Sequence, residues 1–102
     1  MVKFLFADEK GTRKRPGLIV STERYHQGRR EAILAAITSN VGRLLLGDYK
    51  IKAWRDAGLV SPSIVTGIIR TIKQDMVVTK LGDLPAAELR LVEERLREVL
   101  AL

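Results

Sequence analysis

Short apolar runs separated by polar turns dominate the first 80 residues of the chain. They are rich in Val and Ile and end at Gly, Pro, Asn or Asp, which is typical of β-strands. We expect strands over residues 2–6, 18–21, 32–38, 49–52, 64–69 and 76–80. This spacing favours a small barrel or sandwich.

Three of the intervening segments are less regular. Residues 25–30 are polar and fit a loop, whereas residues 43–46, between two glycine turns, fit either a strand or an irregular segment. Gly67 lies inside a predicted strand, which indicates a bulge or the close approach of another backbone. We expect the strand over 32–38, which is almost entirely apolar, to be buried on both faces.

The apolar spacing changes after residue 84. A single helical stripe is formed by Leu89, Val92, Leu96, Val99 and Leu100. It predicts an amphipathic C-terminal helix over about 85–100, with Pro85 at its first position and Glu88 near its positive end. We expect the acidic residues of this helix to form a solvated face.

Composition narrows the possible chemistry. A length of 102 residues favours one domain over 1–102, and the absence of cysteine excludes a disulfide framework, a thiolate metal site and a cysteine nucleophile. The single histidine, His26, leaves no histidine cluster for a metal. Every apolar run is shorter than the ~20 residues of a membrane span, and the run after Lys3 is too short for a secretory signal. A cytoplasmic location is therefore expected.

Positive charge is concentrated in the first part of the chain. Residues 1–31 carry eight Lys and Arg against four acids, and residues 32–60 carry four against two. Residues 61–102 carry six of each, so the net charge of +6 lies before residue 61. Such an excess favours a polyanionic partner such as nucleic acid, although it also serves solubility alone.

Two local stretches are candidates for phosphate contact. Three cations, Arg13, Lys14 and Arg15, precede Pro16, whose fixed φ should hold the adjacent Arg15 more rigidly than Arg13. A rigid guanidinium suits bidentate binding of a phosphate. The strand over 32–38 ends in Thr38, Ser39 and Asn40, each of which can donate a hydrogen bond. Taken singly, these stretches also fit a solvated basic loop and ordinary turn chemistry.

Four segments in order along the chain resemble the MazF/PemK family of toxin endoribonucleases. They are Arg15-Pro16-Gly17-Leu18-Ile19-Val20-Ser21, Ala36-Ile37-Thr38-Ser39-Asn40, the Trp54 to Ser63 stretch with Ala57-Gly58-Leu59 and Pro62, and Lys80-Leu81-Gly82-Asp83-Leu84. Each motif is weak alone, and four in register are specific. The chain departs from the pattern at its N-terminus, where the first strand is shorter than usual, and Lys10 stands where some members carry an acid.

The resemblance implies a mainly β fold, an SH3-like barrel with a C-terminal helix, that pairs as a homodimer and binds a cognate antitoxin. It implies metal-independent cleavage of single-stranded RNA with no cofactor. The family's catalytic Arg and Thr fall on Arg15 and Thr38. We assign RNA binding to Lys10, Thr12, Arg13, Lys14, Ser39 and Asn40. Two alternatives stay open, namely a non-catalytic binding module and a gyrase-targeting toxin of the same fold.

Three other residues invite functional interpretations. His26 is a candidate general base, because histidine is the side chain that most often exchanges protons near neutral pH, but its polar surroundings favour an exposed loop histidine. Tyr49 and Trp54 are able to stack on bases, yet burial against the barrel is the simpler expectation.

Overall fold

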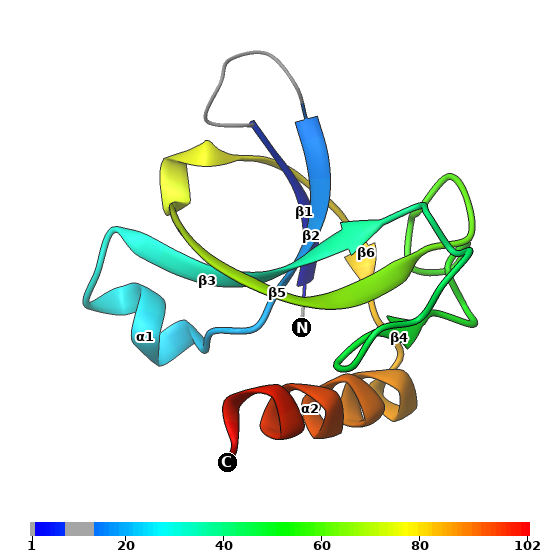
Figure 1. The fold of residues 1–102 in the computed structure, drawn as a ribbon. Coiled ribbons are helices and arrows are strands. Elements are labelled where there is room, and N and C mark those ends of the chain that lie inside the picture. Colours follow the sequence, from blue (N-terminus) through cyan, green and yellow to red (C-terminus); the bar gives the residue numbers. More distant parts are fainter. Residues whose placement is uncertain (1, 8–13) are drawn as a thin grey trace.

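The protein is a curled antiparallel sheet with one long helix beside it (Figure 1). The computed structural model describes residues 2–7 and 14–102. The elements are β1 (Val2–Ala7), β2 (Lys14–Ile19), α1 (Glu23–Gln27), β3 (Glu31–Thr38), β4 (Tyr49–Lys50), β5 (Ile64–Lys73), the 3₁₀ turn η1 (Gln74–Met76), β6 (Val77–Asp83) and α2 (Ala86–Leu100). The mainly β class with a C-terminal helix is confirmed.

The six strands form one sheet in the order β4-β5-β3-β2-β1-β6. β1 pairs with β2 on one side and β6 on the other, so it lies inside the sheet and not at an edge. The edge strands β4 and β6 do not pair in the described part of the chain. Instead, the loop after β4 reaches β6, where a Cβ atom on Gly58 would collide with the Leu81 carbonyl. The sheet is therefore not closed by strand pairing, and this loop contact links its two edges.

Several element boundaries differ from the sequence prediction. β2 begins at Lys14, β5 continues to Lys73, and β4 is only two residues long. Residues 43–46 form no strand. The predicted loop over 25–30 is wrong in its first part, because α1 begins at Glu23 after Thr22, whose Oγ1 accepts a hydrogen bond from the Tyr25 N–H at 3.2 Å. This hydroxyl cap satisfies a free N–H group at the start of the helix.

Strand β3 separates two apolar clusters, as expected for a strand buried on both faces. Ala35 and Ile37 belong to a large cluster with Leu18, Val65 and Val92 of α2. We call this side of the strands the helix face. Because side chains alternate along a strand, Leu34 points the other way and packs with Ile72 in a second cluster. We call this second side the cavity face.

Gly67 marks a bulge in β5, as predicted. Ala35 pairs with Ile69 and Ile37 pairs with Val65, so two steps on β3 correspond to four on β5. Thr66 stabilises the irregularity, because its Oγ1 donates to the Ala36 carbonyl at 2.7 Å and accepts from the Ile68 N–H at 3.2 Å. The loop before β4 also approaches Gly67 closely, with the Leu46 carbonyl and Gly47 Cα beside its Cβ position.

Helix α2 is attached to the sheet by a buried carboxylate. Glu88 is 7% exposed and accepts hydrogen bonds from the Tyr49 hydroxyl at 2.7 Å and from the N–H groups of Lys52 and Ala53 at 2.6 and 3.1 Å. The prediction that the acids of this helix form a solvated face is therefore wrong for Glu88. Pro85 is the N-cap and not the first helical residue.

The remaining side chains of α2 divide along its length. Val92 is buried, and Leu89 and Leu96 pack against the same cluster, whereas Val99 and Leu100 remain exposed. Tyr49 is buried and Trp54 packs against the core, as expected. Within the described ranges, no helix is long and apolar enough to cross a membrane.

Candidate functional site

Strand register brings Arg15 and Thr38 together. Gly17 of β2 pairs with Ala36 of β3. The two strands are antiparallel, so Arg15 and Thr38 each lie two residues beyond that pair in the same direction. A separation of two residues keeps a side chain on the same face. Both side chains therefore lie on the cavity face, on neighbouring strands.

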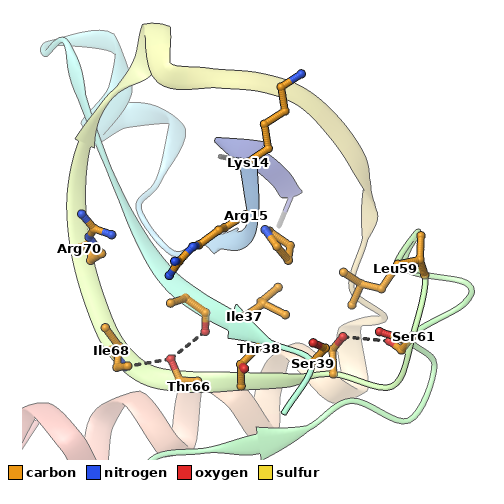
Figure 2. Close-up of a pocket in the computed structure, with 14 residues that line it drawn as sticks. Lys14, Arg15, Ile37, Thr38, Ser39, Leu59, Ser61, Thr66, Ile68 and Arg70 are labelled. Carbon is orange, nitrogen blue, oxygen red and sulfur yellow. Dashed lines mark hydrogen bonds between the residues drawn. The ribbon is translucent and has the colours of Figure 1, made fainter. Parts of the chain in front are cut away.

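Small residues make the cavity possible. On the cavity face, Ile19 and Leu34 pair and fill the space beside them, whereas the next pair, Gly17 and Ala36, offers only a hydrogen and a methyl group. The resulting cavity has a volume of about 560 Å³ and opens to solvent (Figure 2). It is lined by Lys14, Arg15, Pro16, Ala36, Ile37, Thr38, Ser39, Leu59, Val60, Ser61, Ser63, Thr66, Ile68 and Arg70.

The positive charge of the cavity comes from two strands. Lys14 and Arg15 are contributed by β2, and Arg70 is contributed by β5 on the far side of β3. Figure 2 shows the Arg15 guanidinium extending into the cavity and the Arg70 side chain on the β5 wall that lines it. No sequence motif singled out Arg70, because the predicted strand stopped at Ile69. Extending the alternation of Ile68 and Ile72 would have placed it on the cavity face.

The Thr38 hydroxyl is positioned by the turn that follows it. Its Oγ1 accepts a hydrogen bond from the Asn40 N–H at 3.1 Å. This bond uses an oxygen lone pair and leaves the hydroxyl proton available to donate. Thr38 can therefore offer an O–H group to an anion beside Arg15.

The other predicted contact residues are divided between two hollows. Lys14 and Ser39 line the cavity, whereas Asn40 lines a second groove of about 530 Å³. The groove lies between the loop before β4, the bulge of β5 and the end of α2, and Thr38, Thr66 and Ile68 line both hollows. Lys10, Thr12 and Arg13 lie outside the described residues.

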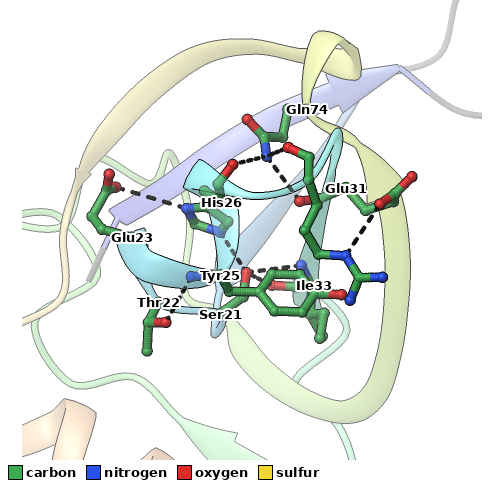
Figure 3. Close-up of polar contacts among 9 residues, drawn as sticks. Ser21, Thr22, Glu23, Tyr25, His26, Glu31, Ile33 and Gln74 are labelled. Atoms are coloured by element: carbon green, nitrogen blue, oxygen red, sulfur yellow. Dashed lines mark hydrogen bonds and ion pairs between the residues drawn. The ribbon is translucent and has the colours of Figure 1, made fainter.

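His26 is not an exposed loop residue, so that expectation is wrong. Its side chain is 16% exposed on α1, and its Nε2 lies 2.5 Å from Ser21 Oγ (Figure 3). Ser21 Oγ also accepts from the Ile33 N–H at 2.9 Å, and Glu23 lies 3.7 Å from the other ring nitrogen. None of Ser21, Glu23 and His26 lines the cavity. The cluster instead connects the segment after β2 to α1 and β3.

The described residues offer little to a metal ion. None of them form a group of three or more His, Cys, Asp or Glu side chains able to hold one. The cavity instead presents ammonium, guanidinium and hydroxyl donors, which suit an anionic oxygen ligand. Fold and cavity together define a class, namely a small curled β-sheet with a helix on one face and an anion-accepting cavity on the other.

Comparison with known proteins specifies the class further. The family model described as PemK-like, MazF-like toxin of type II toxin–antitoxin systems matches residues 2–100. The chain therefore belongs to this family of toxins, as its motifs indicated. No curated protein matches the sequence.

Solved structures support the same fold. The Mycobacterium tuberculosis toxin MazF-mt6 is similar over 100% of this chain and 98% of its own, with a TM-score of 0.85 and 23% identity. A mycobacterial endoribonuclease in complex with its cognate antitoxin covers 97% of this chain and 92% of its own, with a TM-score of 0.78 and 17% identity. The MazE-MazF structure from Deinococcus radiodurans covers 97% and 91%, with a TM-score of 0.76 and 19% identity.

Proposed function

We propose that this toxin is a metal-independent endoribonuclease that cleaves single-stranded RNA, in particular mRNA, in the cavity of Figure 2. MazF-family toxins are endoribonucleases, and the family is established by the match over residues 2–100. The observation that carries the proposal is the strand register, from which Arg15 and Thr38 lie on the cavity face of neighbouring strands, two residues beyond the small pair Gly17 and Ala36. Such an arrangement has room for a phosphodiester and donors for its oxygens.

The proposed reaction uses the nucleophile that RNA carries. The ribose 2′-oxygen attacks the adjacent phosphorus, the bond from phosphorus to the 5′-oxygen breaks, and the products are a 2′,3′-cyclic phosphate and a 5′-hydroxyl. The proton lost by the 2′-hydroxyl is balanced by the one gained at the 5′-oxygen, with water as carrier. Arg15 stabilises the charge that develops on the non-bridging oxygens, and Thr38 orients the phosphate or the 2′-hydroxyl.

Charge stabilisation is the larger part of this mechanism. Among the described residues that line the cavity there is no carboxylate or imidazole, and a guanidinium does not give up its proton in proteins. Arg15 therefore acts through hydrogen bonds and charge. Lys14, together with Lys10 and Arg13, would attract the RNA backbone without regard to sequence. The uncharged residues Thr12, Ser39 and Asn40 would contact the substrate through hydrogen bonds.

We also propose that the protein acts as a homodimer and is inhibited by a cognate antitoxin in the cytoplasm. Leu45 and Leu46, which are 57% and 74% exposed, line the second groove, and the adjacent Leu44 is 56% exposed. An apolar surface of this kind favours a protein contact. Similar structures contain toxin with antitoxin, and the net charge of +6 suits an acidic antitoxin segment.

The decisive test is a cleavage assay in EDTA. Purified protein, Arg15→Ala, Thr38→Ala and the control Arg24→Ala would be incubated with long single-stranded RNA, and the cut ends would be mapped. We expect discrete cuts with cyclic-phosphate ends from the parent protein and from Arg24→Ala, since Arg24 is exposed on α1. Arg15→Ala should lose about 10²–10³ in rate, and Thr38→Ala a large part of it.

The opposite results have definite meanings. Parental cleavage by Arg15→Ala would remove Arg15 from the catalytic site, and undiminished cleavage by Thr38→Ala would do the same for Thr38. RNA left intact by the parent protein would contradict the proposal and favour a binding module. A supercoiling assay would then test the gyrase alternative.

A further inference from the structure

The pairing between β2 and β3 ends before it reaches the two proposed catalytic residues. The last pair is Gly17 with Ala36, and within the described strands the pairing extends no further in that direction. Arg15 and Thr38 each lie two residues beyond this end. The contact between β2 and β3 therefore does not by itself fix the separation of Arg15 and Thr38.

Thr38 is held instead by β5, next to the bulge. It pairs with Ile64 on one side of the bulge, and regular pairing resumes on the other side, where Ala35 pairs with Ile69. A bulge bends the strand that contains it and increases the local twist. The conformation of the bulge therefore determines how the end of β3 that carries Thr38 is placed relative to the part of β3 that pairs with β2.

One side chain spans this break in the register. Thr66 is 8% exposed, and its Oγ1 donates to the Ala36 carbonyl of β3 at 2.7 Å and accepts from the Ile68 N–H at 3.2 Å (Figure 2). A hydroxyl has a single proton to donate, and that of Thr66 is used by the Ala36 carbonyl. Thr66 lines the cavity, but it influences a substrate through the backbone that it holds.

The bulge has a second anchor in the loop before β4. Asp48 Oδ1 accepts a hydrogen bond from the Gly67 N–H at 3.4 Å, and its Oδ2 accepts one from the Leu45 N–H at 3.0 Å. This carboxylate connects the bulge to the loop, whereas the Thr66 hydroxyl connects it to β3. Of the two contacts, the one made by Thr66 joins the bulge to the strand that carries Thr38.

We infer that Thr66 is a positioning residue, which sets the separation of Thr38 and Arg15 by holding the β5 bulge to the Ala36 carbonyl. The inference rests on the proposed function for the roles of Thr38 and Arg15. Two donors that act on one phosphodiester need a fixed separation, because a displacement of about 1 Å can cost about 10²-fold in rate. Loss of the Thr66 hydroxyl should therefore lower kcat more than it raises KM.

The first experiment separates rate from binding. Steady-state cleavage of an RNA oligonucleotide with one mapped cut site would give kcat and KM for the parent protein, Thr66→Val, Thr66→Ser and the control Thr71→Val. Valine keeps the shape of threonine without its hydroxyl, so Thr66→Val should lower kcat about 10- to 100-fold and change KM less than about threefold. Thr66→Ser restores the hydroxyl and should return kcat to within about threefold of the parent value.

The control tests a hydroxyl elsewhere on the same strand. Thr71 is exposed on β5 and lines neither hollow, so Thr71→Val should have parental kinetics. Melting followed by circular dichroism would confirm that every variant is folded at the assay temperature. If Thr66→Val does not fold, Thr66→Cys replaces it, since a thiol is only a weak donor.

The second experiment measures the separation directly and does not require cleavage. Crystal structures of the parent protein, Thr66→Val and Thr66→Ser would give the distance between the Cα atoms of Arg15 and Thr38. This distance should change by about 1 Å in Thr66→Val, the size of displacement that affects rate, and should be unchanged in Thr66→Ser.

The outcomes distinguish this inference from the proposed function. A lower kcat that serine rescues, together with a changed separation, supports Thr66 as a positioning residue. Parental kcat in folded Thr66→Val, no rescue by serine, or an unchanged separation overturns it, while loss of cleavage in Arg15→Ala would leave the proposed function intact. If the parent protein cuts no RNA, the proposed function fails, and the separation alone decides whether Thr66 positions Thr38.

Discussion

At the scale of single residues, the smallest side chains of the cavity face determine what the site can accept. Gly17 and Ala36 are cross-strand partners with very small side chains. They leave an open space between the apolar pair Ile19 and Leu34 on one side and Arg15 and Thr38 on the other. A larger residue at position 36 would enter the cavity from its floor, since Ala36 lines it directly.

Ala36→Leu should therefore abolish substrate access while the fold persists. The added carbons have open space to occupy, so the melting temperature should change little, whereas RNA cleavage should fall at least about tenfold because the phosphate is displaced from Arg15. The matched control is Ala35→Leu, one residue away on the helix face.

Ala35 is fully buried in the large cluster, so the control should behave in the opposite way. Overpacking at that position costs about 1–3 kcal/mol of unfolding free energy. Cleavage by the Ala36→Leu variant at the parental rate, in a folded protein, would show that RNA is bound elsewhere. Urea unfolding and the EDTA cleavage assay provide the two measurements.

At the scale of elements, α2 is held to the sheet by a buried polar contact as well as by apolar packing. Glu88 joins the helix to β4 and the following loop through three hydrogen bonds. Burial, and then the hydrogen bond to Glu88, raise the pKa of Tyr49 to about 12. The folded state therefore favours the neutral phenol.

This shift predicts a loss of stability at alkaline pH. A folded pKa above the ordinary value of 10.0 means that the contribution of Tyr49 is complete below pH 10 and is lost as pH rises towards 12. The loss amounts to at most about 2–3 kcal/mol. Urea unfolding between pH 8 and 12 should show a steeper decline for the parent protein than for Tyr49→Phe.

Tyr25→Phe is the matched control, because it removes the other tyrosine and leaves the contact between Tyr49 and Glu88 in place. It should keep the parental decline. Equal declines in the parent protein and Tyr49→Phe would mean that the phenol of Tyr49 does not contribute to the docking of α2.

At the scale of the whole molecule, the cavity and the second groove form one continuous region. Thr38, Thr66 and Ile68 line both, and the exposed leucines of the loop before β4 border the groove. A second copy of the chain that covers these leucines would also form part of the cavity wall. Dimer formation and RNA cleavage are then expected to depend on each other.

Leu46→Glu should convert the proposed dimer to a monomer and lower cleavage, because burying an unpaired carboxylate is costly. Light scattering after size exclusion would give the mass. Val78→Glu is the control, since Val78 is also exposed, at 48%, but lies on β6 and lines neither hollow. A dimer that persists in Leu46→Glu would place the interface on another surface.

Much of the candidate site could be predicted from the sequence, because its signals are local. The apolar pattern located most strands and the C-terminal helix, and the motifs around Arg15 and Thr38 identified two residues that share the cavity. Gly67 inside a strand correctly indicated a bulge. Alternation, turn chemistry and helical spacing are properties of neighbours along the chain, so they can be read without knowledge of the fold.

Only the tertiary structure determined which distant residues meet. The pairing of Gly17 with Ala36 determines that Arg15 and Thr38 lie on the same face of neighbouring strands. Strand β5 extends far enough for Arg70 to line the same cavity. Glutamate is usually found at the surface, but Glu88 is buried, because β4 and the loop after it supply three hydrogen-bond donors to its carboxylate. Register and burial depend on packing between segments far apart in sequence, and periodicity within one segment does not specify them.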